Sequence, residues 1–108
     1  MTACSDPLLR RMFLGFNRRF WDGALPTDTQ VLWMPLPNDR VAETERLEGG
    51  RFVIRLSPSI AGFPRYYRLI LIHEMCHVHL WGRRIAWHGK VWKGELLRVL
   101  AAGAARWV

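Results

Sequence analysis

The amino-acid sequence predicts a small α+β domain with an N-terminal helix, a short antiparallel three-stranded sheet and two further helices. Apolar residues recur at helical spacing in three segments, and the stretch between the first two is rich in β-forming residues and turn signals. The length of 108 residues is enough for one hydrophobic core but not for a second independent one. We therefore expect a single domain over residues 1–108.

The first predicted helix runs from about Pro7 to Phe20. Asp6 is a suitable N-cap, and proline is tolerated in the first helical turn. Gly23 and Pro26 then end the helix and turn the chain. The apolar positions form one stripe, as expected of a helix that packs on a core: Leu8, Leu9, Met12, Phe13, Phe16 and Phe20.

Short strands are predicted next. Residues 30–34 are mostly apolar and are followed by Pro35, which favours a strand that stops there. Residues 40–46 show no clear periodicity. The run Glu48-Gly49-Gly50 is typical of a tight turn, and polar and apolar residues alternate over residues 51–56. We therefore predict a hairpin around the two glycines.

Two helices complete the predicted order. Pro64 introduces a helix from about Arg65 to Trp81, which Gly82 ends. A basic connector then leads to a last helix, predicted from about Lys90 to Arg106. Apolar residues suited to packing lie along both helices: Leu69, Ile72, Cys76 and Leu80 on the first, and Leu96, Leu97, Val99 and Leu100 on the second.

The composition argues against disorder and against secretion. Half of the residues are apolar, but no run approaches the roughly 18 apolar residues of a membrane span. The N-terminal region carries Asp6, Arg10 and Arg11 where a signal peptide would be apolar. Only two cysteines occur, Cys4 and Cys76, so neither a disulfide framework nor a cysteine zinc ribbon can form. We expect a cytoplasmic monomer without membrane contact.

The helix predicted over residues 65–81 carries a metal-binding pattern. His73 and His77 lie one turn apart on one helix face and can present two imidazole nitrogens to a single ion. Glu74 projects beside that face. This is the H-E-x-x-H arrangement, in which two histidines bind zinc and the glutamate is the general base toward a zinc-bound water. The sequence therefore predicts a zinc site on this helix.

A catalytic zinc ion takes three protein ligands and keeps one position for water. The sequence offers two candidates for the third ligand: His88, which follows a turn after the helix, and Glu95 on the last helix. His79 points to another side of the helix and is better explained as a surface or hydrogen-bonded histidine. Cys76 could complete a structural site, but it shares the apolar side of the helix and is predicted in the core.

Several motifs together resemble one protein family. The metal helix contains His73-Glu74-Met75-Cys76-His77-Val78-His79, and after ten intervening residues from His77 comes His88-Gly89-Lys90-Val91-Trp92. Upstream, residues 16–26 and 52–57 fit the same family. From about residue 12 to residue 100, the chain resembles the SprT-like zinc metallopeptidases, in a minimal form without their C-terminal zinc ribbon.

The resemblance implies a zincin-like fold with one catalytic zinc ion. It implies His73, His77 and His88 as the zinc ligands and Glu74 as the general base, which leaves Glu95 outside the ligand set. The implied reaction is hydrolysis of peptide bonds through a zinc-activated water. Family members with a known role act on proteins attached to DNA, so the resemblance also implies a DNA-associated protein as substrate.

The net charge of +7 favours a polyanionic partner. We therefore expect DNA, single-stranded or protein-bound, as a second candidate partner, with Trp21, Trp87 or Tyr66 stacking on bases. The alternative function is a basic zinc-containing nucleic-acid-binding module without catalysis, although a structural zinc site has no use for the acidic Glu74. The candidate nucleic-acid contacts are Arg18, Arg19, Arg83, Arg84 and Lys90.

Overall fold

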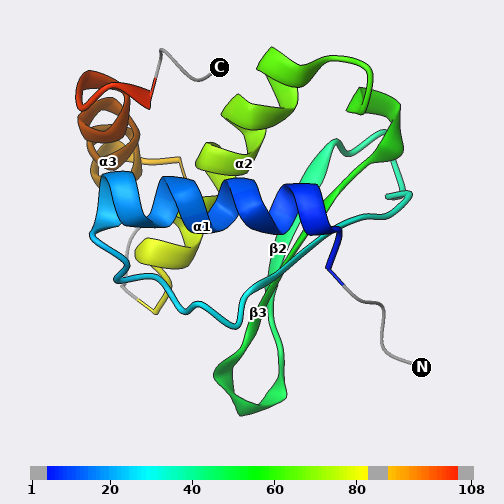
Figure 1. The fold of residues 1–108 in the computed structure, drawn as a ribbon, viewed down its shortest axis with the longest axis horizontal. Helices are drawn as coiled ribbons and strands as arrows, with labels where there is room; N and C mark the ends of the chain where they lie inside the picture. The colour runs from blue at the N-terminus through cyan, green and yellow to red at the C-terminus, as the bar shows by residue number, and fades with distance from the viewer. Residues whose placement is uncertain (1–4, 83–87, 105–108) are drawn as a thin grey trace.

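The computed structural model describes residues 5–82 and 88–104 of the chain. It confirms the α+β class, with three helices and one three-stranded sheet in the described residues (Figure 1). In chain order the elements are α1 (Pro7–Trp21), β1 (Gln30–Trp33), β2 (Ala42–Arg46), β3 (Phe52–Leu56), α2 (Pro64–His79) and α3 (Lys90–Ala101), with short 3₁₀ turns at Glu48–Gly50 and Pro58–Ile60.

Helix α1 lies where the sequence predicts it. The Asp6 carboxylate accepts a hydrogen bond of 3.0 Å from the backbone N–H of Leu9, so the expected N-cap is confirmed. Asp22 and Gly23 follow the helix with φ angles of 52° and 77° and turn the chain. Most of the predicted apolar stripe is buried, but Leu8, at the edge of that stripe, is 55% exposed.

The loop after α1 is held by a buried asparagine. Asn17 donates from Nδ2 to the carbonyl oxygen of Leu25 at 3.1 Å and accepts at Oδ1 from the N–H of Leu25 at 3.0 Å. We expect Asn17→Ala to lower the free energy of unfolding by about 2–4 kcal/mol, because both backbone groups of Leu25 would stay buried without a partner. Urea unfolding measures this. A loss below about 0.5 kcal/mol, as for a surface substitution, would contradict it.

The sheet differs from the antiparallel arrangement that the sequence predicts. Strands β2 and β3 form the expected antiparallel hairpin, but β1 pairs with the other edge of β3 and runs parallel to it, so the order is β1-β3-β2. The connection from β1 to β2 passes over the end of β3, where the N–H of Met34 donates to Leu56 and that of Ser57 donates to Val41. The antiparallel prediction for β1 is therefore wrong, because strand patterns do not reveal which edge a third strand joins.

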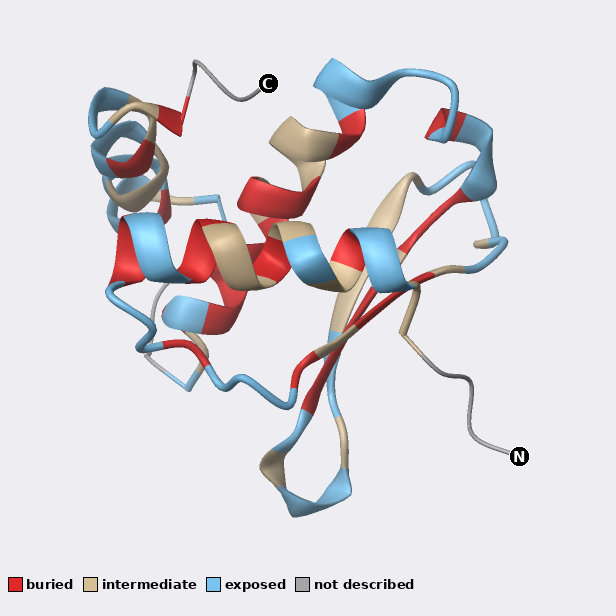
Figure 2. Ribbon diagram, viewed as in Figure 1, coloured by how far each residue is buried: buried red, intermediate tan, exposed pale blue. Residues whose placement is uncertain are grey.

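The helices bury their apolar faces against the sheet and against one another. Helix α2 contacts β2 and β3, α1 contacts β1, and α3 contacts α2. Buried residues, red in Figure 2, run along β3 and the second half of α2. Helix α2 is thus packed between the sheet and α3.

The last helix is shorter than predicted. Helix α3 ends at Ala101, and Gly103 adopts a φ of 115°, a conformation that suits glycine and breaks the helix. The predicted end at Arg106 lies outside the described residues. In the part of the chain that the structure describes, no helix has the length and apolar character needed to cross a bilayer.

Candidate metal centre

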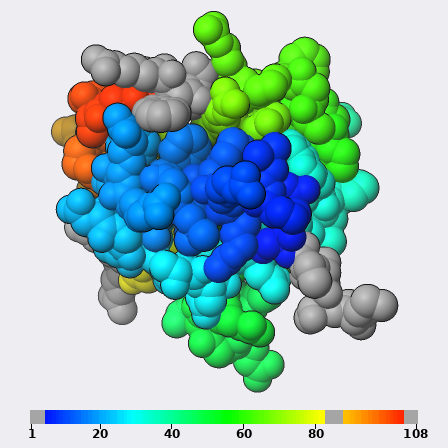
Figure 3. All heavy atoms as spheres, viewed as in Figure 1, coloured from blue at the N-terminus to red at the C-terminus, as the bar shows by residue number. Residues whose placement is uncertain are grey.

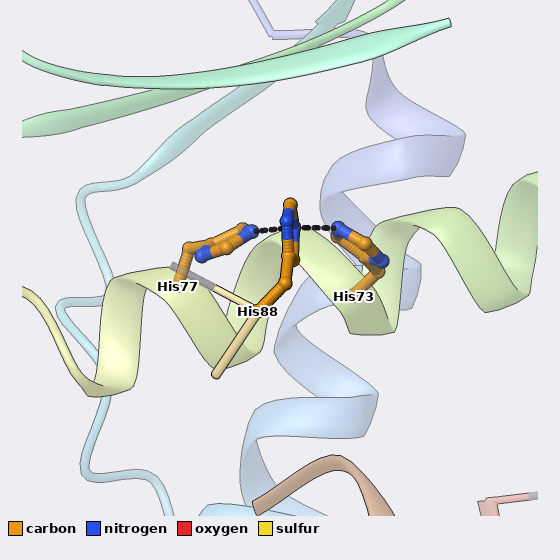
Figure 4. A group of neighbouring side chains, drawn as sticks. All are labelled: His73, His77 and His88. Atoms are coloured by element: carbon orange, nitrogen blue, oxygen red, sulfur yellow. Dashed lines mark hydrogen bonds between the residues drawn. The ribbon is translucent and has the colours of Figure 1, made fainter. Parts of the chain in front are cut away.

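Three histidines that the sequence singles out converge on one point. His73 and His77 project from the same face of α2, and His88 comes from the segment before α3 (Figure 4). The Nε2 atom of His88 lies 3.0 Å from the Nε2 atoms of both His73 and His77. His88 adopts a φ of 62°, an uncommon conformation outside glycine that costs about 1–3 kcal/mol and is often found at functional sites.

The chemistry of these donors fits a metal ion. The His88 Nε2 atom carries either one N–H or one lone pair, so it can make a well-directed hydrogen bond with one neighbouring ring nitrogen but not with both. Zinc–nitrogen bonds of about 2.0–2.1 Å in a tetrahedral site would separate the ligand nitrogens by about 3.3 Å, close to the observed spacing. The three histidines could therefore hold a metal ion.

The indole of Trp92 packs on this histidine cluster. Its ring centroid lies 4.6 Å from that of His73, 5.4 Å from that of His77 and 4.7 Å from that of His88. Trp92 is buried, and its contact with all three candidate ligands could not be predicted from its place in the motif alone. Its position in the first turn of α3, shortly after His88, indicates only that it lies near the site.

Glu74 lies beside the histidines and is almost fully buried. Its Oε1 atom accepts a hydrogen bond of 2.9 Å from the Thr44 hydroxyl, and its Oε2 atom lies 3.5 Å from the Nε2 atom of His73. Burial raises the pKa of Glu74 to about 7, although the hydrogen bond from Thr44 acts in the opposite direction. Thr44, on β2, was not predicted, because its contact depends on how the hairpin packs on α2.

The two helix histidines are shifted toward the neutral form. Burial lowers the pKa of His73 to about 4, and the charge of His88 acts in the same direction. Burial likewise lowers the pKa of His77 to about 4, with further contributions from His73 and His88. Neutral imidazole is the form that binds a metal ion, so both rings are ready to act as ligands at neutral pH.

The site opens into a cleft of about 440 Å³ between β2 and α2. Glu74 and the three histidines share this cleft with residues at and near β2. On the other side the lining residues are Arg40, Ala42, Glu43 and Thr44, with Trp81 at one end. The arrangement places the Glu74 carboxylate and three imidazoles in a single solvent-accessible hollow, with the Glu43 carboxylate on the side of β2.

The other candidate ligand lies elsewhere. The Glu95 carboxylate accepts hydrogen bonds from Trp21 Nε1 at 3.0 Å and from Arg98 at 2.6 Å, and the His79 ring lies 3.9 Å away. Glu95 therefore joins α3 to α1 and does not face the histidine cluster. Cys76 is buried in the core, where burial raises its pKa to about 12 and leaves no thiolate to act as a fourth ligand.

The predicted nucleic-acid contacts do not gather in one place among the described residues. Arg18 and Arg19 are exposed on α1 and line a groove away from the histidines, whereas Lys90 is exposed at the start of α3. Trp21 is buried and bonded to Glu95, so the prediction that it stacks on bases is wrong. Tyr66 is exposed. Three further candidates lie outside the described residues: Arg83, Arg84 and Trp87.

Comparison with known protein families agrees with the resemblance seen in the sequence. The model described as the SprT-like family matches residues 9–105. The match covers nearly the whole chain and includes all three converging histidines and Glu74.

Proposed function

The chain belongs to the SprT-like family, and from this premise we propose that it is a zinc-dependent metallopeptidase that hydrolyses peptide bonds with Glu74 as general base. The observation that carries the proposal is the position of the Glu74 carboxylate. It lies within 3.5 Å of a candidate ligand nitrogen, in the same cleft as three converging imidazoles. Three ligands and a neighbouring unligated carboxylate are the donor set of a catalytic zinc site.

In this mechanism His73, His77 and His88 would hold the ion through the three Nε2 atoms that converge. Zinc bound there supplies Lewis acidity, which polarises a carbonyl group and lowers the pKa of water. Glu74 accepts a proton from the attacking water at Oε2 and passes it to the leaving amide nitrogen. Thr44 holds the other carboxylate oxygen, so that Oε2 keeps its place beside the histidines. Trp92 limits the rotation of the three rings.

We further propose that the substrates are proteins associated with DNA. The family resemblance and the net charge of +7 support this choice. A gel-shift assay with single-stranded DNA over a range of salt concentrations tests the DNA partner. Binding that weakens as salt rises is the expected result, and no binding at low salt would remove DNA from the proposal.

Cleavage is tested by removing and restoring the metal. The purified protein is stripped with a chelator, reloaded with one equivalent of zinc, and incubated with a DNA-binding protein, with and without single-stranded DNA. Cleavage that is lost on stripping and restored by zinc supports the peptidase. One tightly bound zinc ion without cleavage of any substrate would point instead to a non-catalytic, nucleic-acid-binding module.

A conservative change at Thr44 tests how Glu74 is held. Thr44→Val removes the hydroxyl that donates to Glu74 and keeps the shape of the side chain. We expect kcat to fall by about tenfold with KM little changed, because the lost hydrogen bond is made to a charged group. Thr44→Ser restores the hydroxyl and should recover most of kcat. An equal loss in both variants would show that packing, not the hydrogen bond, matters at this position.

The raised pKa of Glu74 predicts how many protons leave when zinc binds. At pH 6.5 a carboxyl group with a pKa of about 7 is mostly protonated, and a nearby cation favours its ionised form. The wild type should therefore release about three quarters of a proton more per zinc than Glu74→Gln. His73 and His77, with pKa values of about 4, have no proton to release at this pH. Calorimetry in two buffers of different ionisation enthalpy measures the difference, and equal release would contradict the prediction.

A further inference from the structure

A second groove, of about 810 Å³, lies between α1 and the first turns of α2. It has no lining residue in common with the histidine cleft. Figure 3 shows α1, in blue, along the front of the molecule, with α2, in green, beside it. The described residues that line the groove are Leu8, Arg11, Met12, Gly15, Phe16, Arg18, Arg19, Arg65, Tyr67 and Arg68.

The charges around this groove are all of one sign. Five arginines line it, and no acidic residue does so among the residues that the structure describes. Within residues 5–82 and 88–104, four of these arginines make no ion pair with Asp or Glu: Arg11, Arg18, Arg65 and Arg68. Clustered like charges destabilise a folded protein unless a partner supplies opposite charge. The groove therefore has the electrostatics of a site for an anionic ligand.

Gly15 opens the middle of the groove. It lies inside α1, where glycine costs about 1 kcal/mol relative to alanine. A Cβ atom added there would meet nothing within 4 Å, so packing of the core does not require glycine at this position. A ligand that approaches the backbone of α1 closely would explain why glycine occupies this position.

The floor of the groove is apolar. Leu8 and Met12 come from α1, and Leu8 is 55% exposed even though it belongs to the apolar stripe. The two aromatic residues of the lining, Phe16 and Tyr67, are only 6% and 7% exposed, so they offer no open ring face for stacking of bases. This floor suits aliphatic side chains better than nucleobases.

The arginines form two rows that flank this floor. On α1, Arg11 and Arg18 lie seven residues apart, about 10 Å along the helix. On α2, Arg65 and Arg68 lie one turn apart. From these rows and the floor we propose that the groove docks an acidic amphipathic segment of a partner protein, with its apolar stripe on the floor and carboxylates along both flanks. This site is independent of the metal centre.

Binding is tested by fluorescence anisotropy with three probes of similar length. The first is a labelled helical peptide of leucine and glutamate with one apolar stripe, the second has lysine in place of glutamate, and the third is single-stranded oligothymidylate. We expect the wild type to bind the acidic peptide at least about tenfold more tightly than either of the other two probes at moderate salt. Preferential binding of the oligonucleotide would overturn the proposal and assign the groove to nucleic acid.

Two variants place the binding in the groove. Gly15→Leu fills the middle of the groove and should weaken peptide binding by about tenfold or more, while raising the melting temperature because leucine favours the helix. The double variant Arg65→Glu with Arg68→Glu should weaken it at least as much. The matched control is the double variant Arg51→Glu with Lys93→Glu, which changes the net charge by the same amount as the first double variant, at exposed positions outside the groove. This control should weaken peptide binding by less than about threefold. Unchanged binding in Gly15→Leu, or equal losses in the two double variants, would overturn the proposal.

Discussion

Replacement of Glu74 by glutamine is expected to lower kcat for peptide cleavage by about a hundredfold to ten-thousandfold while zinc stays bound. Glutamine keeps the size of the side chain, and its amide oxygen can still accept a hydrogen bond from the Thr44 hydroxyl. It cannot accept a proton from water. The candidate ligand nitrogens belong to His73, His77 and His88, so the substitution removes none of them.

The measurement pairs zinc content with initial rates for the wild type and for Glu74→Gln prepared side by side. Equal zinc content with a large loss of kcat would support Glu74 as the general base. If Glu74→Gln cleaves at the wild-type rate, either another group serves as the base or the cleavage comes from a contaminating protease. A variant that loses its zinc as well would show that Glu74 supports the metal site itself.

Substitution of His88 should have the second large effect. His88→Ala removes the nitrogen that lies 3.0 Å from both helix histidines, and we expect zinc affinity to fall by at least about a hundredfold. Competition with a chromophoric chelator measures the affinity. Because His88 adopts a positive φ, alanine at this position bears the same backbone strain as histidine. The zinc affinities should be compared on proteins that circular dichroism shows to be folded.

His79→Ala is the matched control for His88→Ala. His79 lies on the same helix as His73 and His77, but its ring is near Trp21 and Glu95 and is absent from the converging group. We expect its removal to change zinc affinity by less than about twofold. Similar losses in His79→Ala and His88→Ala would mean that zinc does not bind at the converging nitrogens.

The helices and the hairpin could be predicted because their determinants are local. Asp6 caps α1, Gly23 and Gly82 follow the ends of two helices with positive φ, and Gly49 and Gly50 make the hairpin turn. Each of these features depends on residues within a few positions in the chain. The parallel pairing of β1 is not local, because it depends on which edge of β3 remains open after the hairpin forms.

The candidate site could be anticipated only in part for the same reason. The spacing of His73 and His77 on one helix places both rings on one face, which sequence alone establishes. Only the family resemblance favours His88 over Glu95 as the third ligand, because the position of each residue in the sequence is compatible with reaching the two helix histidines. The structure brings His88 to the helix histidines and turns Glu95 toward Trp21. The contact from Thr44 required the packing of β2 on α2.

Helix α3 links the histidine cluster to the far end of α1. Its first turn supplies Trp92, which contacts the three rings, and its later turns supply Glu95 and Arg98, which bond to Trp21 and to the carbonyl oxygen of Phe20. Detachment of α3 would therefore break both sets of contacts in one local unfolding event. The residence time of a bound metal ion should then follow the opening rate of this helix, and amide hydrogen exchange in α3 would report on it.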